Sequence, residues 1–168
     1  MHKPFSINNK LGRFILRVVQ GYNGTKYWNR RFIVTDPLDK TNIILKLYYL
    51  FYIKRTDAKF CCSFGTNLNG GAKFKSRPLL PHGLNGIIIG HDVVVGSNCK
   101  IYQQVTIAND GNVVIGDNVV IGSGAKILKG NIGNNVKVGA NCVVVEDIPD
   151  NATVVMQKPR IILKTDIH

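Results

Sequence analysis

The stretch IIIGHDVVVGSNCKIYQQVTIANDGNVVIGDNVVIGSGAKILKGNIGNNVKVGANCVVV, residues 87–145, decides the fold. Within it an Ile or Val recurs every six positions, with one short insertion and one deletion along the way. Gly often follows this aliphatic residue, and a small apolar residue often stands four positions after it. The aliphatic positions are Ile89, Val95, Ile101, Ile107, Ile115, Ile121, Ile127, Ile132, Val138 and Val144.

A six-residue period fits neither a helix, whose apolar residues recur at three and four, nor an ordinary alternating strand. It suits a short strand followed by a tight corner, with the aliphatic side chain pointing inward. The Gly, Asn or Asp beside it suits the unusual backbone angles of a corner. Three such sides close a triangular coil, and stacked coils share one core. We therefore predict an all-β solenoid over residues 64–149, with about four to five coils.

The segments that flank the solenoid lack this repeat. In the N-terminal region, residues 1–63, we predict an amphipathic helix from Thr41 to about Arg55. Its aromatic side chains are expected to cover the open first coil, since solenoids need capped ends. The C-terminal tail, residues 150–168, is expected to run back along the coils as an edge strand.

The charge is strongly positive, with a formal net charge of +12 at pH 7. Most of the excess of Lys and Arg lies in residues 1–63. This bias favours an anionic neighbour such as phosphate groups, a membrane surface or nucleic acid. A solvated basic face that only aids solubility is the alternative.

The cysteines and the apolar runs bear on the compartment. The chain has four cysteines and no Cys-x-x-Cys pair, and Cys99 and Cys142 stand at small-residue positions of the repeat. We expect both to be reduced core residues of an intracellular protein. The start of the sequence, MHKPFSINNKLGR, has no apolar stretch of signal-peptide length, and the longest apolar run, residues 43–53, is too short to span a bilayer and contains Lys46. A cytoplasmic protein is therefore expected.

Four stretches resemble the hexapeptide-repeat acyltransferases. They are TNLNGGAKF (66–74), LPHGLNGIIIG (80–90), IYQQVTI (101–107) and VVIGDNVVIGSGAKIL (113–128). They are similar to the serine acetyltransferase branch and, given the short N-terminal region, most similar to capsule and exopolysaccharide O-acetyltransferases. The resemblance implies a left-handed parallel β-helix, a homotrimer, and acetyl-CoA as co-substrate without a metal.

In this branch the histidine of the LPHG-type stretch is the catalytic base, which corresponds here to His82. An alcohol is a poor nucleophile at neutral pH, and an imidazole can take its proton as the new C–O bond forms. The thioester is already activated, so a base, a few oriented donors and positioning suffice. The aspartate that orients the base in serine acetyltransferases corresponds here to Asn67, which can accept a hydrogen bond but adds no charge.

Two further differences from serine acetyltransferases concern the acceptor. Pro81 stands where serine acetyltransferases have an aspartate next to the base, and their Arg-His loop is shortened here to residues 108–112. The groups that hold a zwitterionic amino acid are therefore missing. We expect a neutral polyol instead, and predict O-acetylation of a sugar hydroxyl in polysaccharide biosynthesis. Serine O-acetylation is the first alternative.

The resemblance also assigns binding residues. Small-residue corners and nearby cations correspond to the acetyl-CoA site, namely Ala108, Asn109, Gly124, Ala125, Lys126, Gly139, Ala140, Lys158 and Arg160. Tight coil corners would require Gly and Ala at such positions even without a ligand. Tyr102, Gln103 and Gln104 are candidates for the acceptor side, with a plain outward ladder as the alternative.

Two functions of other classes stay open. A metal-dependent hydratase on the same fold, like the γ-type carbonic anhydrases, needs three histidines, whereas the solenoid offers His82 and His91. A non-catalytic basic module that binds nucleic acid or a membrane would follow from the N-terminal charge. We expect no nucleic-acid partner, and a weak membrane-surface association would also fit an enzyme that acts on lipid-linked glycans.

Overall fold

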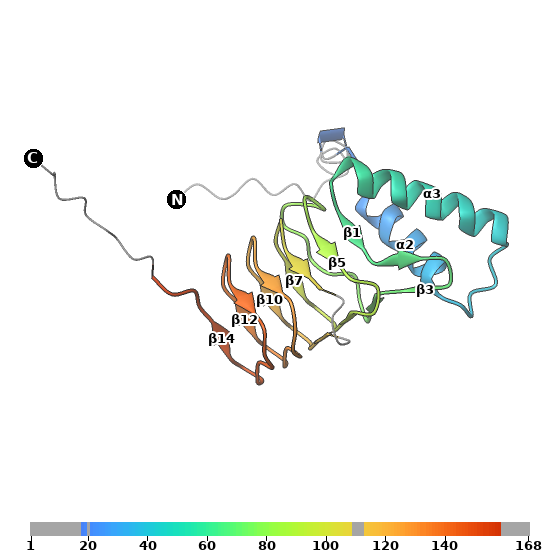
Figure 1. Ribbon diagram of the computed structural model, residues 1–168. Coiled ribbons are helices and arrows are strands. Elements are labelled where there is room, and N and C mark those ends of the chain that lie inside the picture. The colour runs from blue at the N-terminus through green and yellow to red at the C-terminus, as the bar shows by residue number, and fades with distance from the viewer. Residues whose placement is uncertain (1–17, 20, 109–112, 159–168) are drawn as a thin grey trace, which may run out of the picture.

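The computed structural model describes residues 18–19, 21–108 and 113–158. Short parallel strands wind into a three-sided coil, and two helices pack at its N-terminal end (Figure 1). The elements are α2 (Gly24–Thr35), α3 (Ile43–Lys59), β1 (Ser63–Phe64), β2 (Thr66–Asn67), β3 (Gly70–Gly71), β4 (Lys73–Phe74), β5 (Ile88–Ile89), β6 (Val94–Val95), β7 (Lys100–Ile101), β8 (Thr106–Ile107), β9 (Val114–Ile115), β10 (Val120–Ile121), β11 (Lys126–Ile127), β12 (Lys137–Val138), β13 (Val143–Val144) and β14 (Thr153–Val154).

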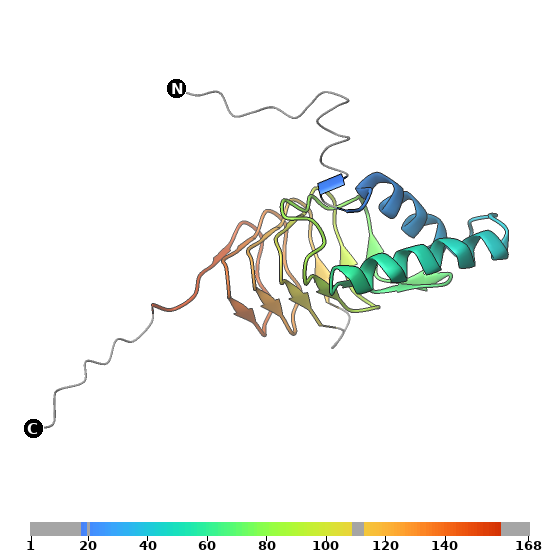
Figure 2. The ribbon, with the colours of Figure 1, turned by 90° about the horizontal axis from the view of Figure 1, so that it is seen from above.

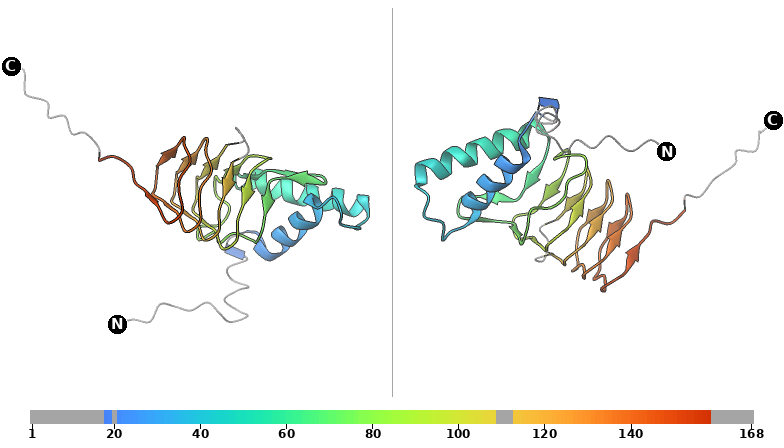
Figure 3. Two further views of the ribbon diagram at one scale, coloured as in Figure 1. Left: turned by 90° about the horizontal axis from the view of Figure 1, so that it is seen from below. Right: turned by 180° about the vertical axis from the view of Figure 1, so that it is seen from behind.

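Three parallel sheets form the sides of the coil. Sheet 1 has the order β1-β5-β8-β11-β13, sheet 2 has β4-β6-β9, and sheet 3 has β14-β12-β10-β7. The chain passes from sheet 1 to sheet 2 at corner 1, to sheet 3 at corner 2, and back to sheet 1 at corner 3. Figure 3 shows the stacked coils from two further sides. Because each strand pairs with the next coil, backbone groups are satisfied along the stack.

The predicted core is confirmed. All ten repeating Ile and Val side chains are at most 2% exposed. In sheet 1, Ile89 pairs with Ile107, which pairs with Ile127. The insertion and the deletion in the repeat therefore fall at corners, where they leave this stacking intact. The thiols of Cys99 and Cys142 are free and buried in the same core, as expected.

The repeated glycines have a different role from the predicted one. Left-handed backbone angles occur mainly at corner asparagines such as Asn98 and Asn118, with φ of 56° and 59°. Gly96, which follows Val95 directly, lies close to the next coil instead. A Cβ there would lie 2.3 Å from the carbonyl oxygen of Gly116. Close stacking of coils, and not backbone conformation, therefore requires glycine at this position.

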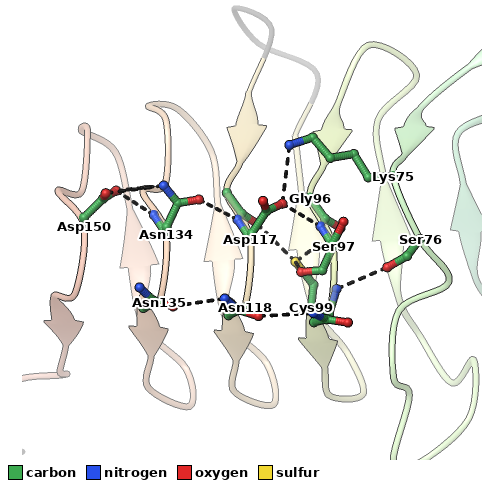
Figure 4. Close-up of polar contacts among 12 residues, drawn as sticks. Lys75, Ser76, Gly96, Ser97, Cys99, Asp117, Asn118, Asn134, Asn135 and Asp150 are labelled. Atoms are coloured by element: carbon green, nitrogen blue, oxygen red, sulfur yellow. Dashed lines mark hydrogen bonds and ion pairs between the residues drawn. The ribbon is translucent and has the colours of Figure 1, made fainter.

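Corner 2 carries a polar ladder that joins successive coils (Figure 4). A carboxylate oxygen of Asp117 accepts from the backbone N–H of Ser97 at 2.7 Å, and Asn134 accepts from the N–H of Asp117 at 2.8 Å. Beside it the side-chain amide of Asn118 donates to that of Asn135 at 3.1 Å. At corner 2 these polar side chains are therefore occupied in holding successive coils together.

The helices cap the first coil in an order that the sequence did not predict. The expected helix is confirmed as α3, but its tyrosine rings pack against Arg30 of a further helix, with the ring centroids of Tyr48, Tyr49 and Tyr52 at 4.4 to 5.3 Å from the guanidinium. This further helix, α2, contacts both α3 and the hairpin strands β2 and β3 of the first coil. Figure 2 shows both helices from above. The indole of Trp28 packs against Phe64 and Phe74, with centroids 5.2 and 5.1 Å away. Trp28 therefore closes the open end of the core.

Arg31 ties α2 to the first coil. The side chain is fully buried, and its Nη2 donates to the carbonyl oxygens of Phe64 and Ala72, each at 2.7 Å. Its Nε donates to Thr66 at 3.1 Å. Buried backbone carbonyl groups need hydrogen-bond partners. The guanidinium supplies them for two carbonyl groups of the first coil, which has no preceding coil to pair with.

The end of the coil also differs from expectation. Instead of running back as an edge strand, Thr153–Val154 continues the solenoid as β14, parallel to β12. The strands therefore extend from Ser63 to Val154, slightly beyond the predicted range of 64–149. Residues 159–168 of the tail lie outside the described residues.

Candidate active site

The loop that carries His82 replaces an ordinary corner 3 in the first coil. Leu79 still pairs with Lys100 of sheet 3, and the chain then detours before it enters β5. Leu84 is fully buried and anchors the detour, whereas His82 is exposed. The side-chain amide of Asn85 donates to the backbone oxygen of His82 at 2.9 Å and holds the loop on the solvent side of the core.

Beside His82 lies an open cavity of about 450 Å³. Its wall is formed by the His82 loop, by Tyr22 ahead of α2 and by Phe60 after α3, together with Val19. The rings of Tyr22 and Phe60 pack edge to face at 5.2 Å. Burial raises the pKa of the Tyr22 phenol, an effect that the nearby Arg77 opposes. The phenol is therefore a neutral hydrogen-bonding group at neutral pH.

Sequence reasoning missed Tyr22 because it did not predict α2, and it missed Phe60 because it ended the following helix at about Arg55, short of Lys59. A signal for α2 was present, since Asn23 caps this helix by accepting from the N–H of Lys26 at 3.1 Å. Apolar residues at helical spacing follow, with Tyr27 and Val34 on the buried side.

The structure brings Tyr102 next to His82. Their ring centroids lie 5.8 Å apart. Gln104 lies on the same side of the coil, and its backbone N–H donates to the oxygen of Asn85 at 3.0 Å. The side-chain oxygen of Gln103 is buried without a hydrogen-bond partner among the described residues. The three acceptor candidates thus stand where corner 3 meets the His82 loop.

Asn67 is not brought to this place. It is exposed at the end of β2, in a hairpin in which it pairs with Gly70. The neighbouring Thr66 accepts a hydrogen bond from Arg31 of α2. The cavity beside His82 is lined instead by Tyr22, which precedes α2 by two residues. Among the described residues no hydrogen bond joins Asn67 to His82. The strand of sheet 1 that precedes the hairpin ends at Phe64, and the extra residues of the hairpin carry Asn67 away from the coil.

The acetyl-CoA candidates fall on two different corners. Gly124 and Ala140 lie on corner 3, the corner that begins with the His82 loop, and Ala125 and Gly139 adjoin them. Backbone bonds run along it from coil to coil, from Gly124 to Gln103 at 3.0 Å and from Asn141 to Ser123 at 2.9 Å. Ala108 begins corner 1, where its N–H donates to Ile127 at 2.8 Å. The chain therefore presents two separate candidate surfaces.

Coil packing already explains the small size of several of these residues. Gly124 has a φ of +70°, and a Cβ there would lie 2.2 Å from the side-chain oxygen of Asn141. A Cβ on Gly139 would lie 3.0 Å from the carbonyl oxygen of Val154. Ala125 is fully buried. Ala140 is exposed, so its small size has no such cause within the chain.

Two of the candidate phosphate ligands are described. Lys126 is exposed on β11, directly after corner 3, and Lys158 is exposed beyond β14. Both are free to reach an anionic ligand on the outer surface. Asn109 and Arg160 lie outside the described residues.

Within the described residues no group of three or more His, Cys, Asp or Glu side chains is arranged to hold a metal ion. No helix described here combines the length and the apolar character needed to cross a membrane.

Comparison with known proteins gives one consistent result. The serine acetyltransferase of Synechococcus elongatus is 38% identical over 111 residues, which cover 62% of this chain and 45% of that protein. The serine acetyltransferase of Staphylococcus aureus is 42% identical over 98 residues, covering 54% of this chain and 46% of that protein. The chain thus spans about half the length of the curated relatives that it matches. No family model matches it.

A solved structure shows the same architecture. The serine acetyltransferase of Neisseria gonorrhoeae superposes with a TM-score of 0.63 at 27% identity, covering 86% of this chain and 57% of that one. The predicted fold class, an all-β solenoid of the left-handed parallel β-helix type with a short, partly helical N-terminal region, is confirmed.

Proposed function

We propose that this chain is an acetyl-CoA-dependent O-acetyltransferase that uses His82 as its general base. The observation that carries the proposal is the position of His82, exposed beside a cavity of about 450 Å³ at the start of corner 3. The similarity of the solenoid to serine acetyltransferases supports acetyl transfer as the reaction.

The chemistry needs few groups. The imidazole of His82 takes the proton of the acceptor hydroxyl as its oxygen attacks the thioester carbonyl. The C–S bond then breaks, and the imidazolium returns the proton to the leaving thiolate, so that the histidine ends unchanged. The neutral phenol of Tyr22 lines the cavity as a hydrogen-bond donor.

For acetyl-CoA itself we propose the outer surface of corner 3. The exposed Ala140 leaves room there for the pantetheine arm to approach the backbone. Lys126 and Lys158 would meet the phosphates as charge-assisted partners. We further propose a homotrimer, in which corner 1 of a neighbouring subunit, with Ala108, faces this surface.

Two acceptors are supported by different observations. The names of the relatives favour serine. The site itself favours a sugar hydroxyl, because Pro81 replaces an acid beside the base and aromatic rings from Tyr22, Phe60 and Tyr102 surround His82. The described residues that line the cavity include no carboxylate to hold the ammonium group of an amino acid, and an aromatic wall suits the apolar face of a sugar ring. We propose the sugar hydroxyl of a glycan precursor, with serine as the second candidate.

One experiment separates the two acceptors. Purified protein is incubated with acetyl-CoA and either serine, nucleotide sugars or oligosaccharides, and the release of free thiol is measured. The proposal predicts faster thiol release with a sugar acceptor than with serine. If serine were acetylated faster, serine would be the acceptor in place of the sugar. If none of the compounds increased thiol release, the acetyl-transfer proposal would be overturned.

A further inference from the structure

Helix α3 exposes several large apolar side chains to solvent, while its buried side contains Lys46, Thr56 and Asp57 beside the single apolar Ile53. Ile44 is 74% exposed and Phe51 64%, whereas Lys46 and Asp57 are only 3% and 4% exposed. A surface helix of a water-soluble protein normally has the opposite arrangement. An exposed apolar surface of this kind marks a place of interaction.

The orientation of α3 is fixed by contacts of its buried polar residues. The ammonium group of Lys46 donates to the carbonyl oxygen of Asp36 at 2.8 Å and to the side chain of Asn69 at 2.9 Å. The hydroxyl of Tyr27 donates to Asp57 at 2.6 Å. Turning the helix to bury its apolar face would leave these groups without partners, at a cost for each buried group.

The exposed residues form one continuous surface, here called the outer face of α3. Its apolar part recurs at helical spacings of three and four, which places it on one side of the helix. Its basic part follows over the last turns. The outer face consists of Ile44, Leu47, Tyr48, Phe51, Lys54, Arg55 and Lys59.

The charge of the outer face selects among partners. Asp57 is the only acid in α3, and it is buried, so the outer face carries basic groups alone. A second copy that packed through this same face would bring the same basic groups opposite these ones and would be repelled. An anionic surface would be attracted, and the net charge of +12 on the whole chain adds to that attraction.

We propose that the outer face of α3 binds the surface of an anionic lipid bilayer. Ile44, Leu47 and Phe51 enter the boundary between headgroups and acyl chains, as the apolar face of an interfacial helix does. Lys54, Arg55 and Lys59 lie at the level of the lipid phosphates. The inference does not depend on the acetyl-transfer reaction.

This placement has a consequence for the candidate active site. The basic end of α3 runs directly into Phe60, which lines the cavity beside His82. A chain bound through α3 therefore holds this cavity close to the bilayer surface. An acceptor carried by a membrane lipid would be presented there.

The experiment is cosedimentation of the full chain with lipid vesicles. Vesicles of phosphatidylcholine alone are compared with vesicles that contain about one third phosphatidylglycerol. We expect binding to the anionic vesicles only, weakening as salt is added. Replacing Leu47 and Phe51 together by Ser should lower the partition coefficient at least about tenfold without a change in charge.

Charge variants test the basic part of the outer face. The pair Lys54→Gln and Arg55→Gln should lower binding to anionic vesicles by about tenfold or more, since each charge near the surface contributes roughly fivefold. Lys73→Gln with Lys137→Gln removes the same charge from exposed positions on the solenoid. Val143→Ser with Val145→Ser removes exposed apolar side chains there, 57% and 59% exposed. Both control pairs should bind like the parent.

Three results would overturn the inference. The first is equal binding of the parent to both kinds of vesicle, or to neither. The second is an equal loss of binding for the α3 and the solenoid charge variants, which would indicate attraction by net charge alone. The third is a parent that binds no vesicles but sediments as a larger assembly than its Leu47 and Phe51 variant, since a second copy would then cover the face. Far-UV circular dichroism and the melting temperature of each variant show that it is folded.

Discussion

The ring planes of His82 and Tyr102 are inclined by 41° at a centroid distance of 5.8 Å. The two residues come from successive coils, because Leu79 before the His82 loop pairs with Lys100 before Tyr102. Coil stacking therefore sets the position of the imidazole against an aromatic wall. This relation makes Tyr102 the best-placed acceptor residue among those that the sequence suggested.

Replacing Tyr102 by Ala should weaken acceptor binding. A ring contact of this kind contributes about 1 kcal/mol, so we expect KM for the acceptor to rise about five- to tenfold. The KM for acetyl-CoA should change little, and Tyr102→Phe should retain most of the affinity. Steady-state kinetics of thiol release measures both constants. An unchanged acceptor KM would show that Tyr102 only continues the outward ladder of the coil.

Replacing Gly96 by Ala should destabilise the solenoid. The added Cβ would lie 2.3 Å from the carbonyl oxygen of Gly116, so the coils would have to separate. We expect a loss of about 1–3 kcal/mol in the free energy of unfolding. Gly70→Ala is the matched control, because a Cβ there meets nothing within 4 Å. Urea denaturation of both variants measures the difference, and equal stabilities would contradict the packing role of Gly96.

Replacing Arg31 by Met should be more damaging. Its loss leaves the carbonyl oxygens of Phe64 and Ala72 without these bonds under α2, and each buried unsatisfied group costs about 1–3 kcal/mol. We expect a total loss of about 3 kcal/mol or more in the free energy of unfolding. Arg55→Met changes an exposed arginine in the same way and should cost less than about 1 kcal/mol. Comparable losses for the two variants would show that Arg31 does not hold the cap.

The carboxyl group of Asp57 should make stability fall as pH rises. Burial raises its pKa above the usual 3.8, although the hydrogen bond from Tyr27 opposes this. The folded chain then binds the proton more tightly than the unfolded chain does. Stability is therefore lost as pH rises from about 3.8 through the pKa of the folded state.

Asp57→Asn removes this titration and can still accept the bond from Tyr27. We expect the free energy of unfolding of the variant, relative to that of the parent, to increase from about pH 3.5 to about pH 7. This is the range over which a carboxyl group with a raised pKa loses its proton. Asp39 and Asp117 have lowered pKa values and act in the opposite direction, but they are present in both proteins and cancel in the difference. A difference that stays constant with pH would contradict the effect of burial on Asp57.

The repeat made the solenoid predictable, because each side of every coil places one aliphatic side chain in the core, and these residues recur every six positions. The period of six does not extend to α2; the helix cap at Asn23 and the apolar residues at helical spacing were its only signal, and the buried Arg31 interrupts that apolar face. The period could not show the hairpin Thr66–Gly71 either, because that segment reads as a weak hexad. Counting along the family motif led to Asn67, which lies in this hairpin at corner 1, whereas His82 of the same chain lies at corner 3. The role of Asn67 beside the base stays a prediction.

The candidate site was predictable only in part for a related reason. His82 and Tyr102 belong to the repeat and its loop, so their relation follows from coil stacking. Tyr22 and Phe60 come from the ends of helices outside the repeat, and only the folded structure brings them to the cavity. The glycines at corner 3 carried little information about a ligand, since contacts such as that of Gly124 with Asn141 already require them.

The rate of acceptor-dependent thiol release from acetyl-CoA by His82→Ala tests the central claim most directly. Lys75→Ala is the control, since Lys75 is also exposed but lies beside Asp117 of corner 2. We predict that His82→Ala lowers kcat by about 10²- to 10⁴-fold while acetyl-CoA still binds, and that Lys75→Ala keeps the parental rate. A His82→Ala protein that turns over at nearly the parental rate would contradict the account.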